Sequence, residues 1–321
     1  MTSTVSRVPT GQEPYHNWLS AQARAARFAC LIRQQYNAPR RVHRIVKAGM
    51  NQIPSPLIDI GANLAHESFA SDFDEVLQRA RAAGLRYLLL TGSSLQSTEQ
   101  VIAISREHDW LFGTAGIHPH EARNCDADVM QQIGELARDP RVLAVGETGL
   151  DFNRDFSPRP QQEKVFTEHL QLAAEIGKPL FLHQRDAHKR FLPLLREYRD
   201  HISAGVVHCF TDERRALYDY MDLDMYIGVT GWICDDRRGK QLQELVREIP
   251  AERLLIETDA PYLLPRSLRP KPRSRRNEPA YLPEVLRMVA ICRDTDPFRL
   301  AQQTTENAQR LFNFPPAAET P

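Results

Sequence analysis

The sequence predicts an α/β protein built as a closed (β/α)8 barrel, a TIM barrel, and three observations lead to this prediction. Eight short apolar runs lie between residues 56 and 259, each with the length of a buried strand. Segments with apolar residues at three- and four-residue spacing, typical of amphipathic helices, separate these runs. The chain has 321 residues, enough for one large α/β domain with an appendage. Eight alternating units favour a closed barrel, with a doubly wound open sheet as the alternative.

The predicted strands share runs of Leu, Ile and Val. They cover residues 56–60, 86–92, 111–117, 141–147, 179–183, 205–210, 225–231 and 253–259. Helices are expected over 72–84, 160–177 and 296–314, and Gly177 is the expected end of the second. Residues 265–279 contain six Arg or Lys and four Pro, which predicts a loop.

Residues 1–55 are predicted to be a basic N-terminal extension, and residues 56–316 the barrel domain. The first 56 residues carry a net charge of +7, and the remainder carries −7. We expect the extension either to be a disordered or partly helical tail or to lie upstream of a natural start at Met50. The alternatives are a basic arm that contacts nucleic acid and an organelle transit peptide.

The composition predicts a cytoplasmic protein without a membrane partner. No apolar stretch approaches the ~18 residues of a membrane span. The five cysteines show no CxxC spacing, which is typical of reduced thiols. Nothing in the sequence resembles a dimerisation element, so a monomer is expected.

Polar residues with chemical function gather where the predicted strands end. Chemistry in such barrels lies at the C-terminal ends of the strands. Those ends carry Asp59, Asn63, Thr91, His118, His120, Glu147, His183, Arg185, His208 and Asp259. A single histidine at a strand end is more often structural than a ligand, and capping of a helix is the structural alternative for His120. However, histidine or carboxylate residues occur at the ends of strands 3, 4, 5, 6 and 8, and this repetition indicates that the fold brings them together in one site.

Two carboxylates and two imidazoles form the predicted metal site, namely Glu147, His183, His208 and Asp259. This mixture of oxygen and nitrogen ligands suits Mn²⁺, Zn²⁺ or Mg²⁺. Glu147 directly follows a buried apolar run, where an uncompensated carboxylate costs several kcal/mol. A dication would compensate it, and two ions bridged by Glu147 would suit in-line attack at phosphorus.

Seven segments, in order, resemble the TatD family of metal-dependent deoxyribonucleases. They are "TAGIHPHEA", "GETGLDFNRD", "FLHQRDAH", "VVHCFT", "GVTGWICDDRRG", "LLIETDAPYLLP" and "SRRNEPAYLP". The resemblance covers residues 57–314 and is strongest to a bacterial branch of Mg²⁺-dependent 3′→5′ exonucleases that degrade single-stranded DNA and RNA.

The resemblance implies a role for each matching residue. Glu147 matches the metal-bridging glutamate, and His183 and His208 match the ligand histidines. Asp259 matches an aspartate that ligates metal and handles the proton of the attacking water. His118 matches a histidine that contacts the substrate phosphate. Glu147, Asp259 and His118 are therefore the expected catalytic residues.

Substrate binding is expected at His118, Arg185, Arg276, Asn277 and Glu278. The last three match a family motif near the mouth of the barrel. The barrel domain is net acidic, so Arg185 and the loop 265–276 are expected to supply local positive charge for nucleic acid.

The first strand departs from a common family pattern. Many members carry an H-x-H pair there, whereas this chain has Gly61 and Asn63. The bacterial branch shares this form. A site without two imidazoles is dominated by oxygen and is expected to bind metal weakly and to prefer Mg²⁺. Asn63 is expected to be a weak ligand, and a positive φ at Gly61 would be a further reason for glycine there.

These expectations predict a metal-dependent phosphodiester hydrolase, a 3′→5′ exonuclease on single-stranded DNA and RNA, in nucleic-acid repair or turnover. Mg²⁺ is the expected cofactor, with Mn²⁺ and Zn²⁺ as alternatives and the number of ions open. An amide or ester hydrolase, including an aminoacyl-tRNA deacylase, is one alternative, but such barrels usually keep the H-x-H pair and a ligand lysine. A non-catalytic nucleic-acid binder is the other, and the complete Glu/His/His/Asp set argues against it.

Overall fold

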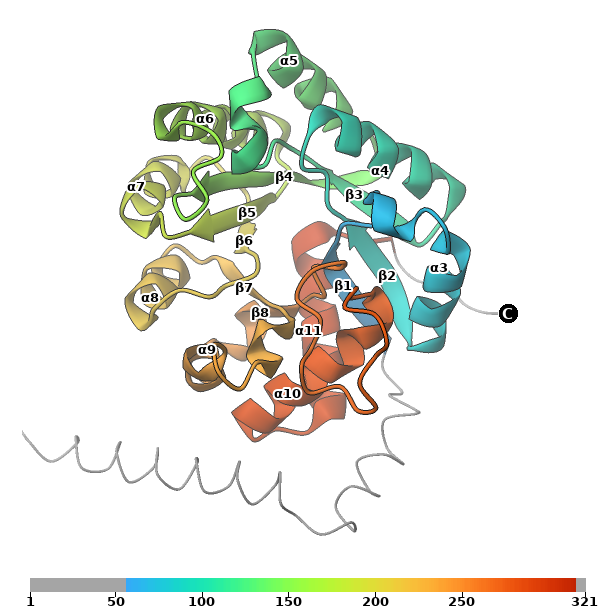
Figure 1. The fold of residues 1–321 in the computed structure, drawn as a ribbon. Coiled ribbons are helices and arrows are strands. Elements are labelled where there is room, and N and C mark those ends of the chain that lie inside the picture. The colour runs from blue at the N-terminus through green and yellow to red at the C-terminus, as the bar shows by residue number, and fades with distance from the viewer. Residues whose placement is uncertain (1–55, 316–321) are drawn as a thin grey trace, which may run out of the picture. The chain divides into compact units, whose positions relative to one another are not determined.

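The computed structural model describes residues 56–315, which form a ring of parallel strands surrounded by helices (Figure 1). The chain divides into two compact units, Met1–Gln52 and Ile53–Pro321, and the first lies outside the described residues. The expectations for the basic extension and for Met50 therefore concern residues outside the described part.

The described strands form one eight-stranded sheet in which each strand pairs in parallel with the next along the chain. They are β1 (Leu57–Ala62), β2 (Leu85–Leu90), β3 (Leu111–Ala115), β4 (Val142–Asp151), β5 (Leu180–Arg185), β6 (Gly205–Val207), β7 (Tyr226–Val229) and β8 (Leu254–Ile256). A doubly wound sheet would place its first strand in the interior of the order. The sequential order confirms the barrel and shows that the open-sheet alternative is wrong.

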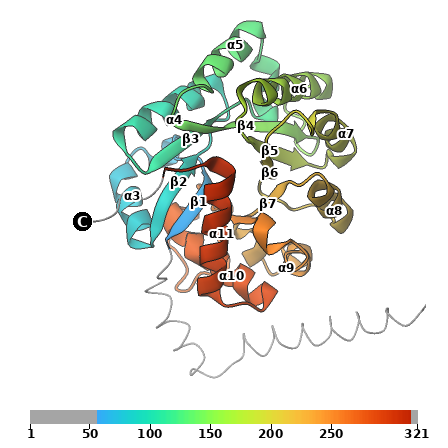
Figure 2. The same cartoon turned by 180° about the vertical axis from the view of Figure 1, so that it is seen from behind.

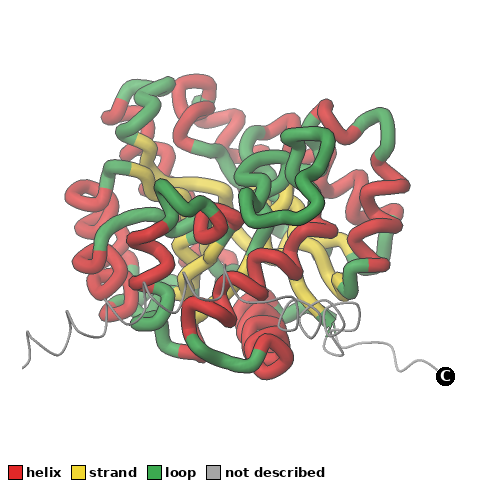
Figure 3. Tube along the Cα trace, turned by 60° about the horizontal axis from the view of Figure 1, so that its bottom comes forward, coloured by secondary structure: helices red, strands yellow, loops and turns green. Residues whose placement is uncertain are grey.

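Helices cover the outside of the ring, as the views from the front, from behind and from the side show (Figures 1, 2 and 3). They are α3 (Phe73–Ala82), α4 (Leu95–Glu107), α5 (Ala127–Leu136), α6 (Arg159–Ile176), α7 (His188–Tyr198), α8 (Arg214–Asp222), α9 (Lys240–Leu245), α10 (Leu282–Arg293) and α11 (Pro297–Phe312). Short 3₁₀ helices lie at η2 (Glu67–Phe69), η3 (Pro119–Asn124), η4 (Gly231–Cys234), η5 (Ala251–Arg253) and η6 (Pro279–Tyr281). No helix in the described range is both long and apolar enough to cross a bilayer.

The three expected helices correspond to α3, α6 and α11. Gly177 ends α6 in the left-handed conformation, with φ 71°, as its position predicted. Residues 265–278 contain neither helix nor strand, which confirms the predicted loop.

Several strands are shorter than expected, and two of them end just before residues of the predicted site. The predicted strands 205–210 and 253–259 shrink to β6 and β8, each of three residues. The chain adopts positive φ at Cys209 (47°) and Asp259 (55°), and an L-residue in that conformation cannot continue an extended strand. His208 and Asp259 therefore lie just beyond the ends of β6 and β8.

The ring closes between β8 and β1 by a short seam instead of a ladder. One parallel bridge joins Ala62 to Ala260, and the backbone N–H of Asn63 donates to the Ala260 carbonyl at 2.7 Å. The buried Asp59 carboxylate also crosses the seam and accepts from the Thr258 backbone N–H at 2.9 Å and from the Thr258 hydroxyl at 2.5 Å. A second backbone hydrogen bond, from the Asp259 N–H to the Gly61 carbonyl at 2.8 Å, also crosses the seam, so the closure combines a few backbone bonds with the Asp59 side chain.

Helix α11 covers the opposite end of this seam (Figure 2). Its Asn307 amide donates to the carbonyls of Ala251 and Leu254, where β8 begins. Its Thr305 hydroxyl donates to the carbonyl of Pro56, just before β1. Strand residues such as Leu57 and Leu88 are fully buried, and each such side chain contributes about 1.5–3 kcal/mol. This core leaves the C-terminal ends of the strands as the polar end of the barrel.

Candidate functional site

A β-bulge in β4 presents Glu147 at the mouth. Gly146 pairs with Phe181 and Thr148 with Leu182, so Glu147 is an extra residue between two ladder pairs. Bulges of this kind turn a side chain out of the regular alternation of a strand. Gly146 has φ 137°, and a Cβ there would lie 2.1 Å from the carbonyl oxygen of Phe181. Glycine is therefore required immediately before the carboxylate.

Three imidazoles surround one oxygen of the buried Glu147 carboxylate. Glu147 Oε1 lies 2.8 Å from His208 Nε2, 3.0 Å from His183 Nδ1 and 3.4 Å from His118 Nε2. Burial acts to raise the pKa of Glu147, but the electrostatic interactions with His118 and His208 and the hydrogen bonds from His183 and His208 hold that pKa well below its usual range. The buried carboxylate is thus ionised and is compensated by imidazoles that approach from three other loops and strands.

His118 is oriented by the 3₁₀ helix that follows β3. Its Nδ1 accepts a hydrogen bond from the backbone N–H of His120 at 3.1 Å, which caps η3 and directs Nε2 toward Glu147. Burial lowers the pKa of His118 to about 3, although the charge of Glu147 acts in the opposite direction. His118 is therefore a neutral imidazole. The structural alternative of helix capping, considered for His120, applies to His118.

His120 instead belongs to a relay that ends at His183. His120 Nε2 lies 2.8 Å from Asp151 Oδ2, and the same oxygen lies 3.5 Å from His183 Nε2. Asp151 Oδ1 accepts from the backbone N–H groups of Asn153 and Arg154 at 2.9 and 2.8 Å, which fixes the carboxylate. Burial acts to lower the pKa of His183, but its interactions with the Asp151 and Glu147 carboxylates raise it overall. Asp151 thus holds the ring of His183 in place.

A second buried carboxylate, Glu257, lies behind His208. Its Oε1 accepts from the backbone N–H of Cys209 at 2.6 Å, and its Oε2 lies 3.4 Å from His208 Nδ1. Burial acts to lower the pKa of His208, but the charges of Glu147 and Glu257 raise it well above its usual value. Carboxylates on both ring nitrogens therefore fix the orientation of this imidazole.

The space occupied by Glu257 explains Gly61. A Cβ at Gly61 would lie 2.5 Å from Glu257 Oε2, and one at Gly228 would lie 2.7 Å from Oε1. Gly61 is not among the residues with positive φ in the described chain. The expected conformational reason for glycine at this position is therefore wrong, and the reason is the buried carboxylate beside it.

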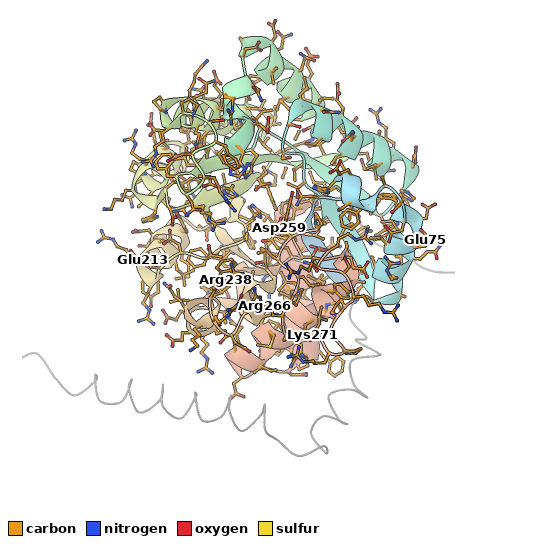
Figure 4. All side chains as sticks on the ribbon, in the orientation of Figure 1. Glu75, Glu213, Arg238, Asp259, Arg266 and Lys271 are labelled. Carbon is orange, nitrogen blue, oxygen red and sulfur yellow. The ribbon has the colours of Figure 1, made fainter. Side chains whose placement is uncertain are left out.

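Asp259 and Asn63 meet at the seam between β8 and β1. The Asn63 amide donates to Asp259 Oδ1 at 3.1 Å. Figure 4 shows Asp259 near the middle of the ring of strands. Burial raises the pKa of Asp259 to about 7, with the charge of His208 acting in the opposite direction. Asp259 therefore belongs to the same cluster of interacting charges as Glu147 and His208.

The donor set and its unsatisfied atoms fit a divalent cation. One ligand atom from each of His118, Glu147 and His183 lies within 4.8 Å of the others. Among the described residues, five buried side-chain polar atoms make no hydrogen bond. Three of them have only longer ion-pair contacts, His183 Nε2 with Asp151 at 3.5 Å and His208 Nδ1 with Glu257 Oε2 at 3.4 Å. Buried polar atoms normally have partners. The imidazole nitrogens and the carboxylate oxygens of this cluster are the ligand types that a divalent cation binds.

The predicted substrate-binding residues occupy two kinds of position. Arg276 forms a bidentate pair with Asp72, at 2.7 and 2.6 Å, and lies over the ring of Phe69. Glu278 pairs with Arg79 at 2.7 Å. The buried Asn277 amide donates to the Thr258 carbonyl at 2.9 Å. These contacts tie the loop 265–279 to α3 and to the seam, and the substrate role of the three residues stays a prediction.

Arg185 is different, because it ends β5 with an exposed side chain. It follows His183 by two residues, so both side chains project on the same side of the strand. The side chain is therefore available to a ligand at the mouth, and its predicted role also stays a prediction.

Sequence reasoning placed Asp59 and His120 at the strand ends without assigning them a role, and it missed Asp151 and Glu257 as functional residues. Glu257 follows the apolar run Leu254–Ile256 as Glu147 follows Val142–Val145, so the same argument about a buried carboxylate applied to it. Asp151 gave no comparable signal, since only the fold brings it to His120 and His183.

Comparisons with known proteins agree with this geometry. The family model described as TatD related DNase matches residues 58–313. The 3'-5' ssDNA/RNA exonuclease TatD of Klebsiella pneumoniae (strain 342) is 50% identical over 258 residues, which cover 80% of this chain and 98% of that protein. The protein of the same name from Salmonella typhimurium is 50% identical over 256 residues, covering 80% and 98%.

Solved structures show the same barrel. YJJV, a TATD homolog from Escherichia coli K12, has a TM-score of 0.74 at 27% identity and covers 81% of this chain and 98% of its own. A hydrolase of the TatD family from Entamoeba histolytica has a TM-score of 0.73 at 26% identity, covering 80% and 98%. A family match over nearly all the described residues, together with relatives at half identity over almost their whole length, places this chain in the TatD family of metal-dependent deoxyribonucleases.

Proposed function

We propose that the chain is a 3′→5′ exonuclease that hydrolyses phosphodiester bonds at the end of single-stranded DNA and RNA with the help of a divalent metal. The observation that carries the proposal is the Glu147 carboxylate held by three imidazoles at the mouth of the barrel. The relatives at 50% identity bear the name of this activity. The family match and the cluster support the same class of reaction.

Glu147, His183, His208 and Asp259 are the residues that would hold the metal, with Asn63 as a weak ligand. A bound divalent cation supplies positive charge to phosphate oxygens and makes a bound water more acidic. We infer Mg²⁺ as the ion, since Asp259 and Asn63 at the junction of β8 and β1 offer carboxylate and amide oxygen, with Mn²⁺ and Zn²⁺ as alternatives.

The residues of the chain would orient the phosphodiester and move one proton. His118 is neutral and its Nδ1 is occupied by η3, so its Nε2 is the atom available to a non-bridging phosphate oxygen. The Asn63 amide holds Asp259 Oδ1, which leaves the other carboxylate oxygen as the acceptor for the proton of the attacking water. Asp151 and Glu257 would keep His183 and His208 in their orientations.

Substrate binding outside the reacting centre is assigned to Arg185 and to the stretch Arg276–Glu278. Arg185 would contact a phosphate directly with its exposed guanidinium. Arg276, Asn277 and Glu278 would act by shaping the loop 265–279, because their side chains are held by Asp72, Thr258 and Arg79.

The domain organisation, oligomeric state and cellular location are part of the same proposal. We infer a catalytic domain of residues 56–316 that acts as a monomer, with residues 1–55 as an appended basic segment. The four cysteines of the described range are free thiols, which is typical of a reducing compartment and supports a cytoplasmic enzyme of nucleic-acid repair or turnover.

A 5′-labelled single-stranded oligonucleotide tests the proposal directly. After chelation and addition of Mg²⁺, the protein should produce a ladder that shortens from the 3′ end, and a 3′-phosphorothioate linkage should stop it. Double-stranded DNA and a model amide serve as parallel substrates. Internal cuts, or hydrolysis of the amide without any ladder, would show that the proposed activity is wrong.

A further inference from the structure

Two exposed aromatic rings flank the candidate metal site. In the described residues, the exposed large hydrophobic side chains are Phe156, Tyr218, Tyr262 and Phe298. Phe156 is 50% exposed and Tyr262 is 52% exposed, and both lie in loops that follow strands of the mouth, β4 and β8. Packing in the core of the barrel does not explain why these two rings lie beside a charged site, since about half of each side chain is exposed.

Phe156 is joined to the site by a row of rings. Its ring centroid lies 4.7 Å from that of His120, and the centroid of His120 lies 4.3 Å from that of His118. The His118 centroid in turn lies 4.4 Å from that of His183. Phe156 is therefore the outermost ring of a series that begins at the Glu147 cluster.

The loop that carries Phe156 is anchored directly after the ring. The next residue, Ser157, is buried, and its hydroxyl donates to the His120 carbonyl at 2.8 Å and accepts from the Arg123 N–H at 3.0 Å. The Gln162 amide donates to the Ser157 carbonyl at 2.8 Å. The exposure of Phe156 is thus fixed by the fold of the loop.

Tyr262 is fixed on the other side of the mouth. Its backbone N–H donates to the carbonyl of Asp259 at 2.9 Å, so the ring follows the candidate proton acceptor by one turn. Its ring meets the edge of His66, with centroids 5.9 Å apart. The neighbouring Pro261 carbonyl accepts from the Asn277 N–H at 3.0 Å, which ties the turn to the loop 265–279.

We propose that Phe156 and Tyr262 are stacking platforms for two bases of a single-stranded substrate, one on each side of the scissile phosphodiester. The inference rests on the proposed function and adds the part of the site that recognises the bases. Unpaired bases stack on aromatic rings with about 1–3 kcal/mol each and with little sequence preference. Bases inside a duplex are stacked on both faces by neighbouring pairs, so two fixed rings at the mouth select single strands and tolerate both DNA and RNA.

The first test compares Phe156→Ala and Tyr262→Ala with the wild-type protein on a single-stranded oligonucleotide. Each substitution should raise KM about 10-fold, while kcat changes less than about threefold, as expected for lost stacking. Phe156→Tyr and Tyr262→Phe keep a ring and should stay within twofold of the wild type. Tyr218→Ala removes an equally exposed ring from α8, away from the mouth, and should change neither constant.

A second substrate separates stacking from loss of structure. In this oligonucleotide the last two 3′ nucleotides are abasic. On the abasic strand, the wild-type KM should rise to the value that the alanine variants show on the normal strand. The KM of the alanine variants should not rise further on the abasic strand. An unchanged KM for both alanine variants on the normal strand, or an equal loss on the abasic strand, would overturn the inference.

Binding without catalysis distinguishes this inference from the proposed function. In chelator, a strand with 2-aminopurine at the two 3′-terminal positions should be quenched by the wild-type protein and much less by the alanine variants. Ring-dependent quenching without any cleavage after metal is added would contradict the exonuclease proposal but would support the stacking platforms. Cleavage without ring-dependent quenching would contradict the platforms alone.

Discussion

The two sides of the barrel mouth are built differently. On the side of β3 to β6, imidazoles of His118, His183 and His208 surround Glu147, and β4 and β5 form a ladder of six pairs. On the side of β8 and β1, the closure has one backbone bridge, and the polar groups are carboxylates and the amide of Asn63. We call these the imidazole side and the seam side.

This comparison indicates that one metal site could combine ligands that bind strongly with ligands that bind weakly. Imidazole binds most divalent transition metals more strongly than amide or carboxylate oxygen does. The six-pair ladder of β4 and β5 fixes the positions of Glu147 and His183 on the imidazole side, whereas the seam side has only a few hydrogen bonds between β8 and β1. We therefore expect metal affinity and geometry to come from the imidazole side, and lability to come from the seam side.

The largest effect should follow from breaking the imidazole side. Glu147→Ala should lower hydrolysis of a single strand at least ~10²-fold, because the carboxylate is the common partner of the three rings. Circular dichroism should show an intact fold. Glu163→Ala on the exposed face of α6, where Glu163 pairs with Arg190, is the matched control and should stay within twofold. A Glu147→Ala protein with more than half its activity would refute the metal assignment.

A smaller loss is expected when the seam side loses its amide. Asn63→Ala removes the hydrogen bond to Asp259 Oδ1 and should lower kcat/KM about 10-fold, since a hydrogen bond to a charged group contributes about 1.5–3 kcal/mol. The Mg²⁺ concentration for half-maximal rate should rise as well. Gly61 cannot be tested in the same way, because any side chain there meets Glu257. An Asn63→Ala enzyme with unchanged metal dependence would exclude Asn63 from the site.

Loops on the seam side should contribute to affinity for the phosphate backbone. Arg238 and Arg266 lie side by side, both within 3.1 Å of the buried Asp235 carboxylate, and their side chains are half exposed (Figure 4). Replacing both by Gln should weaken binding of a single strand by a few fold and lower the slope of log K against log salt by about one per arginine. Arg190→Gln on α7 is the control. An unchanged slope of log K against log salt would show that neither arginine contacts the substrate.

The smallest effect on activity is expected from the seam itself. Thr258→Val removes the hydroxyl that donates to Asp59, leaves a buried carboxylate oxygen without its partner, and should cost about 1–3 kcal/mol in the free energy of unfolding. Urea unfolding measures this loss, while activity at low temperature should fall no more than a few fold. Thr167→Val in α6, whose hydroxyl bonds a carbonyl of its own helix, should cost much less. Equal losses in both variants would show that the seam is not held by Asp59.

The sequence predicts the barrel and the imidazole side because both depend on local patterns. Strand and helix periods repeat along the chain, and Glu147, His183 and His208 each follow an apolar run that marks a strand end. The seam side was harder to predict, since Asp59, Thr258 and Glu257 meet only when the first and last strands close the ring. The capping role of His118 and the link from His120 to Asp151 depend on the turn at η3, which residue spacing alone does not determine.

Metal titration of the wild-type protein tests the central claim most directly, namely that Glu147 and its imidazoles form a divalent-metal site with one weak side. The protein is dialysed against chelator, and Mg²⁺, Mn²⁺ and Zn²⁺ are then added while single-strand degradation and bound metal are measured. The account predicts no activity after dialysis and recovery with Mg²⁺ in the millimolar range. Full activity straight after dialysis, with two zinc ions retained per chain by elemental analysis, would contradict it.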